Sequence, residues 1–437
     1  MAEAVIERTI VRNSWRGVLP EVTGNVRVDA EVYALVGLVV RQFVDSWHGK
    51  ITEEREFLVQ VAIAIGQVAQ GLAKRCEKLE MDEVLLDGIP SVILTHIRDI
   101  RLARERLEND SVPYKSIEEA FMSVHGHPAM KSHEDEQLFV KVLAKGLTSA
   151  LLDDSAVKSP CASSLVTAII SDIGIKNLTD KLSEPWMIYE IFTNTILATL
   201  SPAKKQEMAS PPPARASIER TKFLDQVKGL YVKAIQGFAS AIASGAKALE
   251  LVLPYYGSSY GAGIPVAQRT VFPMITGLLG LDKRKPLLTN LIYGLSVPLR
   301  APGTILARLS TGAVSGTINK HVNIRVVETI LQNARRVVFP NDGLMGPPRI
   351  IPNAQQQLEL KARTRQVMLD VIPDGVVSTV LGGAEECVDH FLGIFENKTI
   401  NKHLVYRLLD YLVLTLVAEL RELTPSQLKQ ARQSSLG

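Results

Sequence analysis

The chain has 437 residues, of which 46% are hydrophobic and 22% are charged, and its formal net charge is +3. This composition is typical of a folded globular protein and excludes wholesale disorder. The small net charge provides no strong basic field of the kind that nucleic-acid binding requires, so we expect no nucleic-acid partner. The cysteines Cys76, Cys161 and Cys387 form no CxxC pair, which favours a reducing compartment over a zinc ribbon or a disulfide framework.

The N-terminal segment "MAEAVIERTIVRNSWRG" carries charges throughout and lacks the apolar core of a signal peptide. The segments 235–253 and 264–281 come nearest to a membrane span, but charged residues or prolines interrupt both. We therefore expect no membrane-spanning helix. The mean hydropathy of +0.12 is nevertheless high, so the fold has to cover much apolar surface.

Helical periodicity is the dominant pattern along the chain. In "LLDGIPSVILTHIRDIRLARERL" (85–107), apolar residues recur every three or four positions with arginines opposite, and Asp87 and Pro90 are typical of a helix start. Alternating strand-like runs between Asn-Gly or Asp-Gly turns are missing from the sequence. It therefore predicts an all-α fold.

Two stretches divide these helices. Residues 201–217, "SPAKKQEMASPPPARAS", are rich in Pro, Ala and Ser, and they predict an exposed linker. The segment 221–281 that follows is apolar nearly all round, and a second Pro/Gly-rich loop at 339–353 precedes the last helices. The residues after Glu422 are polar and predict a frayed tail.

The segment "VHGHPAMKSHEDE" (124–136) contains His125, His127, His133 and Glu136, which are side-chain types that bind zinc. However, Gln137 stands where the HExxH spacing requires the second histidine. The central Gly-His-Pro is instead typical of a chain reversal before a helix with an acidic first turn. We interpret His127–Pro128 as a turn that sets the angle between two helices, with His125 and His133 as bystanders, and we expect no metal site.

A second chemical pattern, "GSSYG" (257–261), matches G-x-S-x-G with Ser259 as the would-be nucleophile. The motif requires a strand before the serine and a helix after it, whereas Pro254 and Pro265 flank this copy. A Gly/Ser loop is the favoured interpretation. We expect no catalytic residues and no enzymatic activity.

Several apolar helix faces remain, and we consider two interpretations of them. They are either ordinary helical core or the joint lining of an apolar cavity for an acyl chain. The cavity candidates are Val166, Ile169, Ile170, Ile173, Leu288, Leu291, Ile292, Leu295, Leu299, Ile305, Leu306, Leu309, Val327, Leu331, Val376, Val380, Leu408 and Leu412. Basic clusters that could rest on anionic headgroups, or form a solvated face, are Lys283, Arg284 and Lys285, and Arg335 and Arg336.

Three stretches of the first half resemble the PXA domain of the sorting-nexin family. They are "FVDSWHGKITEEREF" (43–57), "VHGHPAM" (124–130) and "SPCASSLVTAIISDIGIKNLTDKLSEPWMI" (159–188), the last of which contains the family's Leu-Ser-(Asp/Glu)-Pro run. The segments "VIPDGVVSTVLGG" and "NKTINKHLVYRLLDYLVLTLVAEL" resemble the nexin C-terminal domain. Larger members of the family also carry PX, RGS and transmembrane segments, and we find no counterpart of these in the sequence. In this respect the chain resembles the small soluble fungal members.

The resemblance implies a domain order of N-terminal extension (1–24), PXA domain (25–200), Pro-rich linker (201–220), apolar helical connector (221–284), nexin C-terminal domain (285–423) and polar tail (424–437). It implies that the two helical domains dock into one unit around a large apolar cavity. The expected function is lipid binding and lipid transfer at membrane contact sites, and the alternative is a tether or scaffold without transfer.

The same resemblance implies where the protein acts and what it contacts. We expect a peripheral cytoplasmic protein at the endoplasmic reticulum and its contacts with vacuole, endosome or lipid droplets. The expected partners are phospholipid, the membrane surface and organelle-contact proteins. No cofactor is expected beyond a bound phospholipid or fatty acyl chain.

Overall fold

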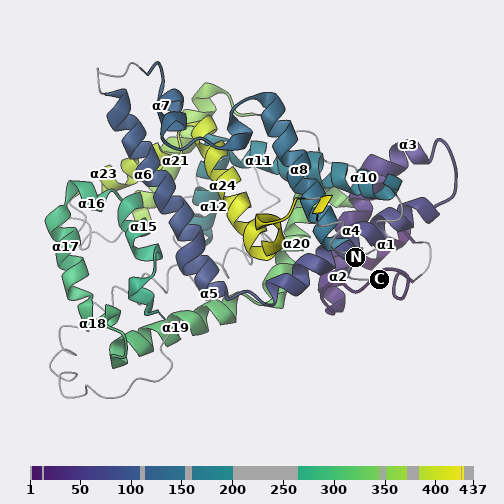
Figure 1. Ribbon diagram of the computed structural model, residues 1–437, viewed down its shortest axis with the longest axis horizontal. Helices are drawn as coiled ribbons and strands as arrows, with labels where there is room; N and C mark the ends of the chain where they lie inside the picture. The colour runs from purple at the N-terminus through teal and green to yellow at the C-terminus, as the bar shows by residue number, and fades with distance from the viewer. Residues whose placement is uncertain are drawn as a thin grey trace.

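The computed structural model describes residues 2–11, 14–108, 114–152, 160–199, 264–343, 346, 351–371, 383–424 and 426–427. Within these ranges the regular structure is helical throughout, apart from one isolated bridge between Arg16 and Leu19 (Figure 1). The predicted all-α class is thus confirmed for the described residues. The predicted linker, most of the connector, Ser259, Val376 and Val380 lie outside them.

The N-terminal half comprises long helices joined by short helical turns. Its elements are α1 (Ala2–Thr9), α2 (Val26–Val40), η1 (Arg41–Asp45), α3 (Ser46–His48), α4 (Glu56–Cys76), α5 (Met81–Glu83), η2 (Val84–Gly88), α6 (Ile89–Leu107), α7 (Ile117–Val124), η3 (Pro128–Met130), α8 (His133–Leu151), α10 (Pro160–Ala168), η4 (Ile169–Lys176), α11 (Asn177–Leu182) and α12 (Pro185–Thr199).

Helices α1, α2, α4, α8 and α10 enclose the first apolar core, which includes Ile6, Leu38, Val61 and Val166. Local signals set the helix starts. The Asn25 side chain accepts hydrogen bonds from the amides of the first turn of α2, and Ser132 caps α8 in the same way. The apolar faces of these helices then meet because each buries its stripe against its neighbours.

We expected no segment that could span a membrane, but the core helix α4 is an exception. By length and composition alone it is apolar enough to cross one, and 33% of its most apolar window is buried within the protein. The buried positions include Leu58, Val61 and Ala62, which belong to the first apolar core. In the described fold α4 therefore serves as a core helix.

The C-terminal half contains η5 (Val266–Gln268), α15 (Val271–Leu278), α16 (Leu281–Arg284), α17 (Pro286–Leu295), α18 (Val297–Arg300), α19 (Ile305–His321), α20 (Ile324–Val338), η6 (Pro340–Asp342), α21 (Ala354–Val371), α23 (Ala384–Ile394), α24 (Lys398–Leu416) and η8 (Ala418–Arg421).

The two halves are interleaved. A second apolar core combines Ile97 and Phe121 of the first half with Phe391 and Leu404 of the second, and α12 packs along α21. Helix α24 contributes Tyr406 and Val413 to the first core and Ile400 and Leu404 to the second. It crosses the middle of the molecule in Figure 1. One C-terminal helix thus joins both cores.

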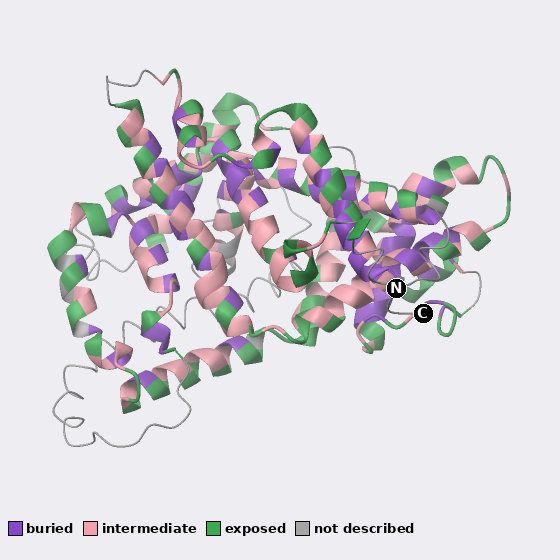
Figure 2. Cartoon of the chain, viewed as in Figure 1, coloured by how far each residue is buried: buried purple, intermediate pink, exposed green. Residues whose placement is uncertain are grey.

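Residues 281–325, hereafter the arm, comprise α16–α19 and the first two residues of α20. The arm extends away from the two cores at the left and lower edge of Figure 1. Side chains anchor it to the body: the Arg101 guanidinium pairs with Asp282 at 2.5 Å, and the Ser315 hydroxyl donates to Asp82. Figure 2 shows fewer buried positions along the arm than in the helices of the cores.

Candidate functional site

Helix α24 contacts the first half of the chain through several polar side chains that are buried or half-buried. The Lys402 ammonium lies 2.8 Å from Asp180 and also contacts Glu136, whose carboxylate accepts a 2.6 Å hydrogen bond from the Tyr406 hydroxyl. Burial lowers the pKa of Lys402, but its hydrogen bonds to Asp180 and Glu136 reverse this and raise the pKa overall. Burial and the bond to Glu136 both raise the pKa of Tyr406. Lys402 therefore stays charged and Tyr406 neutral.

The start of α24 meets the end of the Leu-Ser-Glu-Pro run. The Asn401 amide donates to the Ser183 carbonyl at 3.2 Å and to the Phe395 carbonyl at 2.8 Å, and Lys398 pairs with Glu184. Ser183 and Asn401 are buried. The two segments that carry the resemblances in the first and second halves are thus in direct contact.

Further along α24, the ring of its own His403 lies near the rings of His96, His125 and His127. His403 packs against His96 of α6, with ring centroids 6.1 Å apart and nearly parallel planes, and edge-on against Phe121. Both histidines are buried, and neither ring nitrogen of either has a hydrogen-bond partner among the described residues. Burial is the main cause that lowers the pKa of each to about 3, and the neighbouring histidines add to it. Both rings are therefore neutral at physiological pH.

The other two histidines make ordered hydrogen bonds that define their tautomers. His125 Nε2 lies 3.0 Å from the Arg407 guanidinium, which can only donate, so Nδ1 carries the proton and donates to Asp99 at 3.0 Å. The buried His127 accepts from the Ala129 amide at Nδ1, so its Nε2 donates to Asp410 at 2.9 Å.

These contacts refine the interpretation of the 124–136 segment. The predicted turn at His127–Pro128 is confirmed, because it forms η3 between α7 and α8. The prediction that His125 is a bystander is wrong, since it links α6 and α24 through Asp99 and Arg407, whereas His133 is exposed. Within the described ranges, no three His, Cys, Asp or Glu side chains are grouped so as to hold a metal ion.

A second buried polar centre surrounds Arg335 of α20. Its guanidinium is 1% exposed and donates to Glu31 of α2 at 2.9 Å and to Asp342. Arg8 also donates to the Asp342 carbonyl, at 2.7 Å, and Arg41 to the Gly343 carbonyl. Three arginines thus hold the turn after α20 against the N-terminal helices. This corrects the expectation that Arg335 lies on a membrane-facing surface.

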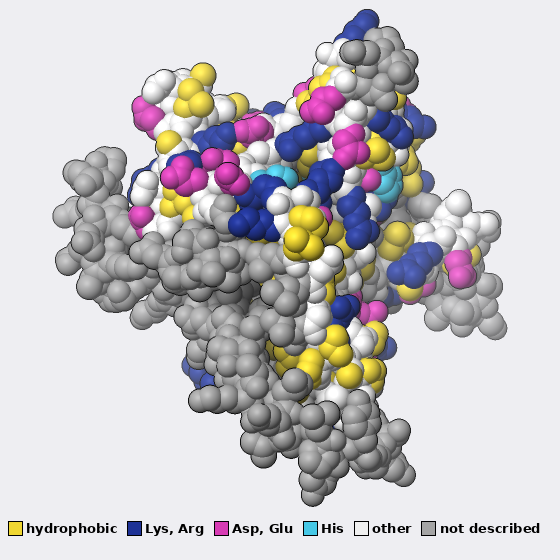
Figure 3. Space-filling view, turned by 90° about the vertical axis from the view of Figure 1, so that its left-hand side faces the viewer, with side chains coloured by type: hydrophobic (Ala, Val, Ile, Leu, Met, Phe, Trp, Pro, Cys, Tyr) yellow, Lys and Arg dark blue, Asp and Glu magenta, His cyan; other side chains and the backbone are white. Residues whose placement is uncertain are grey.

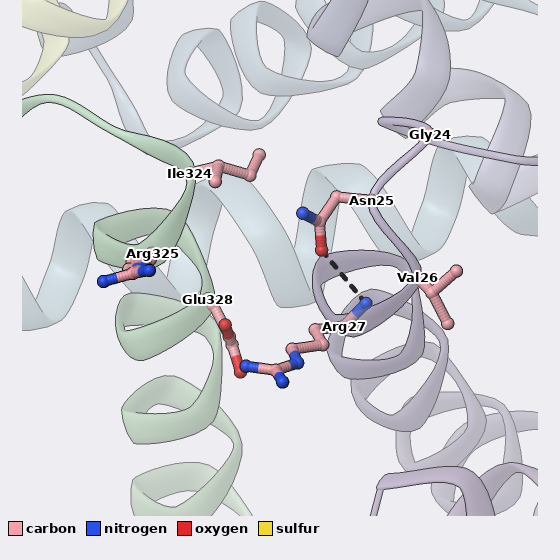
Figure 4. Close-up of a pocket in the computed structure, with 7 residues that line it drawn as sticks. All are labelled: Gly24, Asn25, Val26, Arg27, Ile324, Arg325 and Glu328. Atoms are coloured by element: carbon pink, nitrogen blue, oxygen red, sulfur yellow. Dashed lines mark hydrogen bonds between the residues drawn. The ribbon is translucent and has the colours of Figure 1, made fainter.

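A recess of about 510 Å³ lies between the first turns of α2 and α20 (Figure 4). Asn25 Oδ1 accepts from the Arg27 amide at 3.1 Å, and the Arg27 side chain points toward Glu328 across the recess. An adjoining recess of about 580 Å³ shares Arg27 and Glu328 and adds Arg16, Glu3 and Arg336. Charged side chains of both signs line these two recesses. An acyl chain requires an apolar lining, which neither recess has.

The predicted cavity residues fall into separate groups. Val166, Ile169, Ile170 and Ile173 pack in or against the first core, and Leu408 packs against the second. Leu299 is buried and Ile292, Leu306 and Leu331 are half-buried, while Ile305, Leu309, Val327 and Leu412 are exposed. For Leu288, Leu291 and Leu295 only the backbone placement in α17 is described.

The predicted basic surface is partly engaged in ion pairs. Lys283 contacts Glu105 of α6, and Arg284 pairs with Glu386 of α23 at 2.7 Å and contacts the buried Cys387 thiol. Lys285 is half-buried and Arg336 is exposed. The Lys283–Arg284 cluster therefore joins α16 to the body in addition to facing solvent.

Sequence reasoning missed His96, His403 and the partners of Arg335. A signal for His96 was present, because it continues the apolar stripe of Ile89, Val92 and Ile93 on α6 and so predicts a buried position. No local pattern points to Glu31 as the partner of Arg335, since more than half of the chain separates them.

The comparisons with known proteins identify a family for the first half of the chain. The PXA domain family matches residues 25–195. An uncharacterised protein of Saccharomyces cerevisiae is 21% identical over 88% of this chain and 78% of its own length. Sorting nexin-14 of Danio rerio is 21% identical over 43% of this chain and 19% of its own length, and sorting nexin-25 of Homo sapiens is 28% identical over 33% and 16%.

PXA domain protein 1 of Schizosaccharomyces pombe is 21% identical over 39% of this chain and 34% of its own length. The chain thus covers 78% of the Saccharomyces relative but only 16–34% of the other three. No solved structure matches the chain. The protein carries a PXA domain at residues 25–195 and is related to sorting nexins 14 and 25 and to PXA proteins of yeasts.

Proposed function

We propose that the protein binds lipid acyl chains and transfers lipids between organelle membranes, without a catalytic step. In this proposal the second half is a nexin C-terminal domain docked on the PXA domain through α24. The protein acts at contacts of the endoplasmic reticulum with vacuole, endosome or lipid droplets, alongside organelle-contact proteins. The bound group is a phospholipid or a fatty acid.

The observation that carries the proposal is the apolar surface of α17–α20. Apart from Val338, side chains of these helices take no part in the three apolar cores found among the described residues. Ile292, Leu306 and Leu331 are only half-buried, and α20 turns its polar Arg335 toward α2. Although α20 packs on α2 and Leu299, Ala307 and Ile318 are buried, the half-buried and exposed apolar side chains of these helices offer surface that a bound acyl chain would cover, at about 0.8 kcal/mol per methylene.

The test is mass spectrometry of lipids that copurify with the full chain, together with extraction of lipid from liposomes. Leu306→Trp with Leu331→Trp should lower bound lipid about tenfold or more, because blocking two methylenes forfeits about 1.6 kcal/mol. The matched control is Leu138→Trp on α8, at a position that is 61% exposed and outside these helices. Protein that carries and extracts no lipid would contradict the proposal.

The alternative is a tether or scaffold in which the same helices bind proteins at a contact site. The interleaving of both halves through α24 favours it as a second candidate, because such a unit presents one rigid surface. The same variants separate the two functions. A carrier loses lipid while its melting temperature is kept, whereas a scaffold has no bound lipid to lose.

A further inference from the structure

The arm has an unusual distribution of charge. Between Asp282 and Glu328 the sequence contains no aspartate or glutamate, although the whole chain has 46 acidic residues against 49 basic ones. The same stretch carries the basic residues Lys283, Arg284, Lys285, Arg300, Arg308, Lys320 and Arg325. The nearly neutral chain therefore concentrates positive charge in one structural element.

The arm also exposes large apolar side chains. Leu287 of α17 is 85% exposed, Val297 of α18 is 56% exposed and Leu309 of α19 is 65% exposed. Single exposed leucines are ordinary on protein surfaces, but a series of them along one element indicates an interaction surface. Figure 3, which faces the left-hand side of Figure 1, shows hydrophobic side chains gathered low on this side, below Lys and Arg side chains that are interspersed with Asp and Glu.

On α19 the two kinds of side chain share one face. Ile305, Leu309, Gly312 and Gly316 follow each other at helical spacing and are exposed, and open space surrounds the position of a Cβ at both glycines. Arg308 and Lys320 flank this face. Among the described residues, neither they nor Arg325 form an ion pair with a carboxylate, whereas Lys283 and Arg284 do. Their charges remain available to a partner.

We propose that the arm is a docking surface for a membrane that contains anionic lipids. Leucines at the water-facing side of a helix insert between headgroups, and flanking Lys and Arg side chains bind the negative surface. The absence of acidic residues between Asp282 and Glu328 removes the repulsion that such a surface would meet. A nucleic acid would satisfy the charges but would leave the exposed leucines in water.

This inference deepens the proposed function, because a lipid carrier has to contact its membranes, and it rests on that function for its biological meaning. The residues of this surface differ from the two basic clusters that the sequence predicted as membrane-facing. The surface rests on the exposed Arg308, Lys320, Leu287 and Leu309, whereas Arg335 lies in the interior.

The experiment is flotation of the full chain with phosphatidylcholine vesicles, with and without phosphatidylserine, at low and high salt. We expect binding to the anionic vesicles that weakens as salt screens the charges. Arg308→Gln with Lys320→Gln should weaken binding about 30-fold, since each basic residue near an anionic surface contributes about 1 kcal/mol. Leu287→Ser with Leu309→Ser should weaken it about tenfold or more, because the inserted apolar groups are lost.

Matched controls lie on the exposed face of α8. Lys141→Gln with Lys145→Gln, and Leu138→Ser, change the same residue types at exposed positions outside the arm and should leave binding unchanged. Equal helix content and melting temperature of all variants, from circular dichroism, exclude misfolding as the cause of a loss.

Three outcomes would overturn the docking surface. They are wild-type protein that binds neither kind of vesicle, arm variants that bind like wild type, and dimers that form through the leucines in place of vesicle binding. The lipid content of the same preparations is a separate readout. Docking by protein that carries no lipid would contradict the proposed function alone, and lipid-loaded protein that does not dock would contradict the arm alone.

Discussion

The four histidines and Arg335 show how buried polar side chains are accommodated at the level of single residues. Arg335, His125 and His127 keep their hydrogen bonds because each finds partners on another helix. His96 and His403 have no such partners, and a buried polar group without a hydrogen bond destabilises the folded state. Burying a neutral imidazole costs much less free energy than burying an imidazolium ion, so both rings stay neutral.

The stability of the protein should therefore depend on pH through His96 and His403. Their folded-state pKa is about 3, below the unfolded value, so the unfolded chain binds more protons between these values. Stability should be full above about pH 6.5 and fall with acidification, by about 2 kcal/mol per histidine at pH 5. The free energy of unfolding in urea at pH 7.5 and pH 5 measures this loss.

The variants that check this assignment are His96→Leu and His403→Leu. Each should reduce the loss on acidification by about 2 kcal/mol, because leucine does not titrate. His133→Leu is the control, since His133 is exposed and its replacement should leave the acid dependence unchanged. An unchanged acid dependence in both His96→Leu and His403→Leu would contradict the assignment.

At the level of elements, α24 is the helix on which the junction depends. Its sequence "KTINKHLVYRLLDYLVLTL" places polar side chains on several sides, and each meets a different partner helix. Lys402 meets α8 and α11, His403 meets α6 and α7, and Asp410 meets His127 at the N-terminal cap of η3. At Gly88 the approach is so close that a Cβ there would lie 1.7 Å from the Tyr411 hydroxyl.

Gly88→Ala should therefore displace α24 at Tyr411. We expect a destabilisation of about 1–3 kcal/mol, as for other insertions into packed sites, measured by urea unfolding. Tyr411→Ala removes the opposing ring, so the double variant should lose less than the sum of the two single variants.

The matched control for this substitution is Gly312→Ala on α19. Nothing lies within 4 Å of its added Cβ, so the alanine should stabilise the helix by about 0.5–1 kcal/mol. Additive effects of Gly88→Ala and Tyr411→Ala would show that the two positions are not in contact.

For the whole molecule, the distribution of buried side chains predicts two levels of local stability. Helices α2, α4 and α24 pack into the two large apolar cores, whereas α17–α19 contribute to none of the described cores. Segments with few buried apolar contacts open without global unfolding.

Native-state hydrogen exchange should therefore be faster in α17–α19 than in α2, α4 and α24. The expected difference is at least about 100-fold in protection, which corresponds to about 2.7 kcal/mol of opening free energy. Mass spectrometry of peptides from each helix measures it, and addition of anionic vesicles should slow exchange in the arm alone. Uniform protection along the chain would show that the arm belongs to the cooperative core.

The sequence by itself determined the helical class, because helix periodicity and caps are local properties. The helix at 85–107 is α6 (Ile89–Leu107), and the turn at His127–Pro128 was readable from its Gly-His-Pro pattern. The PXA resemblance of the first half was readable too, because it rests on short runs of side chains.

Only the tertiary structure decided which side chains meet. His125 contacts Arg407, Arg335 pairs with Glu31, and His403 packs against His96. In each case, hundreds of residues separate the two positions in the sequence. Both α19 and α4 carry apolar residues at helical spacing, yet Ile305 and Leu309 of α19 are exposed whereas Leu58 and Val61 of α4 are buried in the first core. Periodicity identifies the apolar face of a helix, but burial depends on which helices pack beside it.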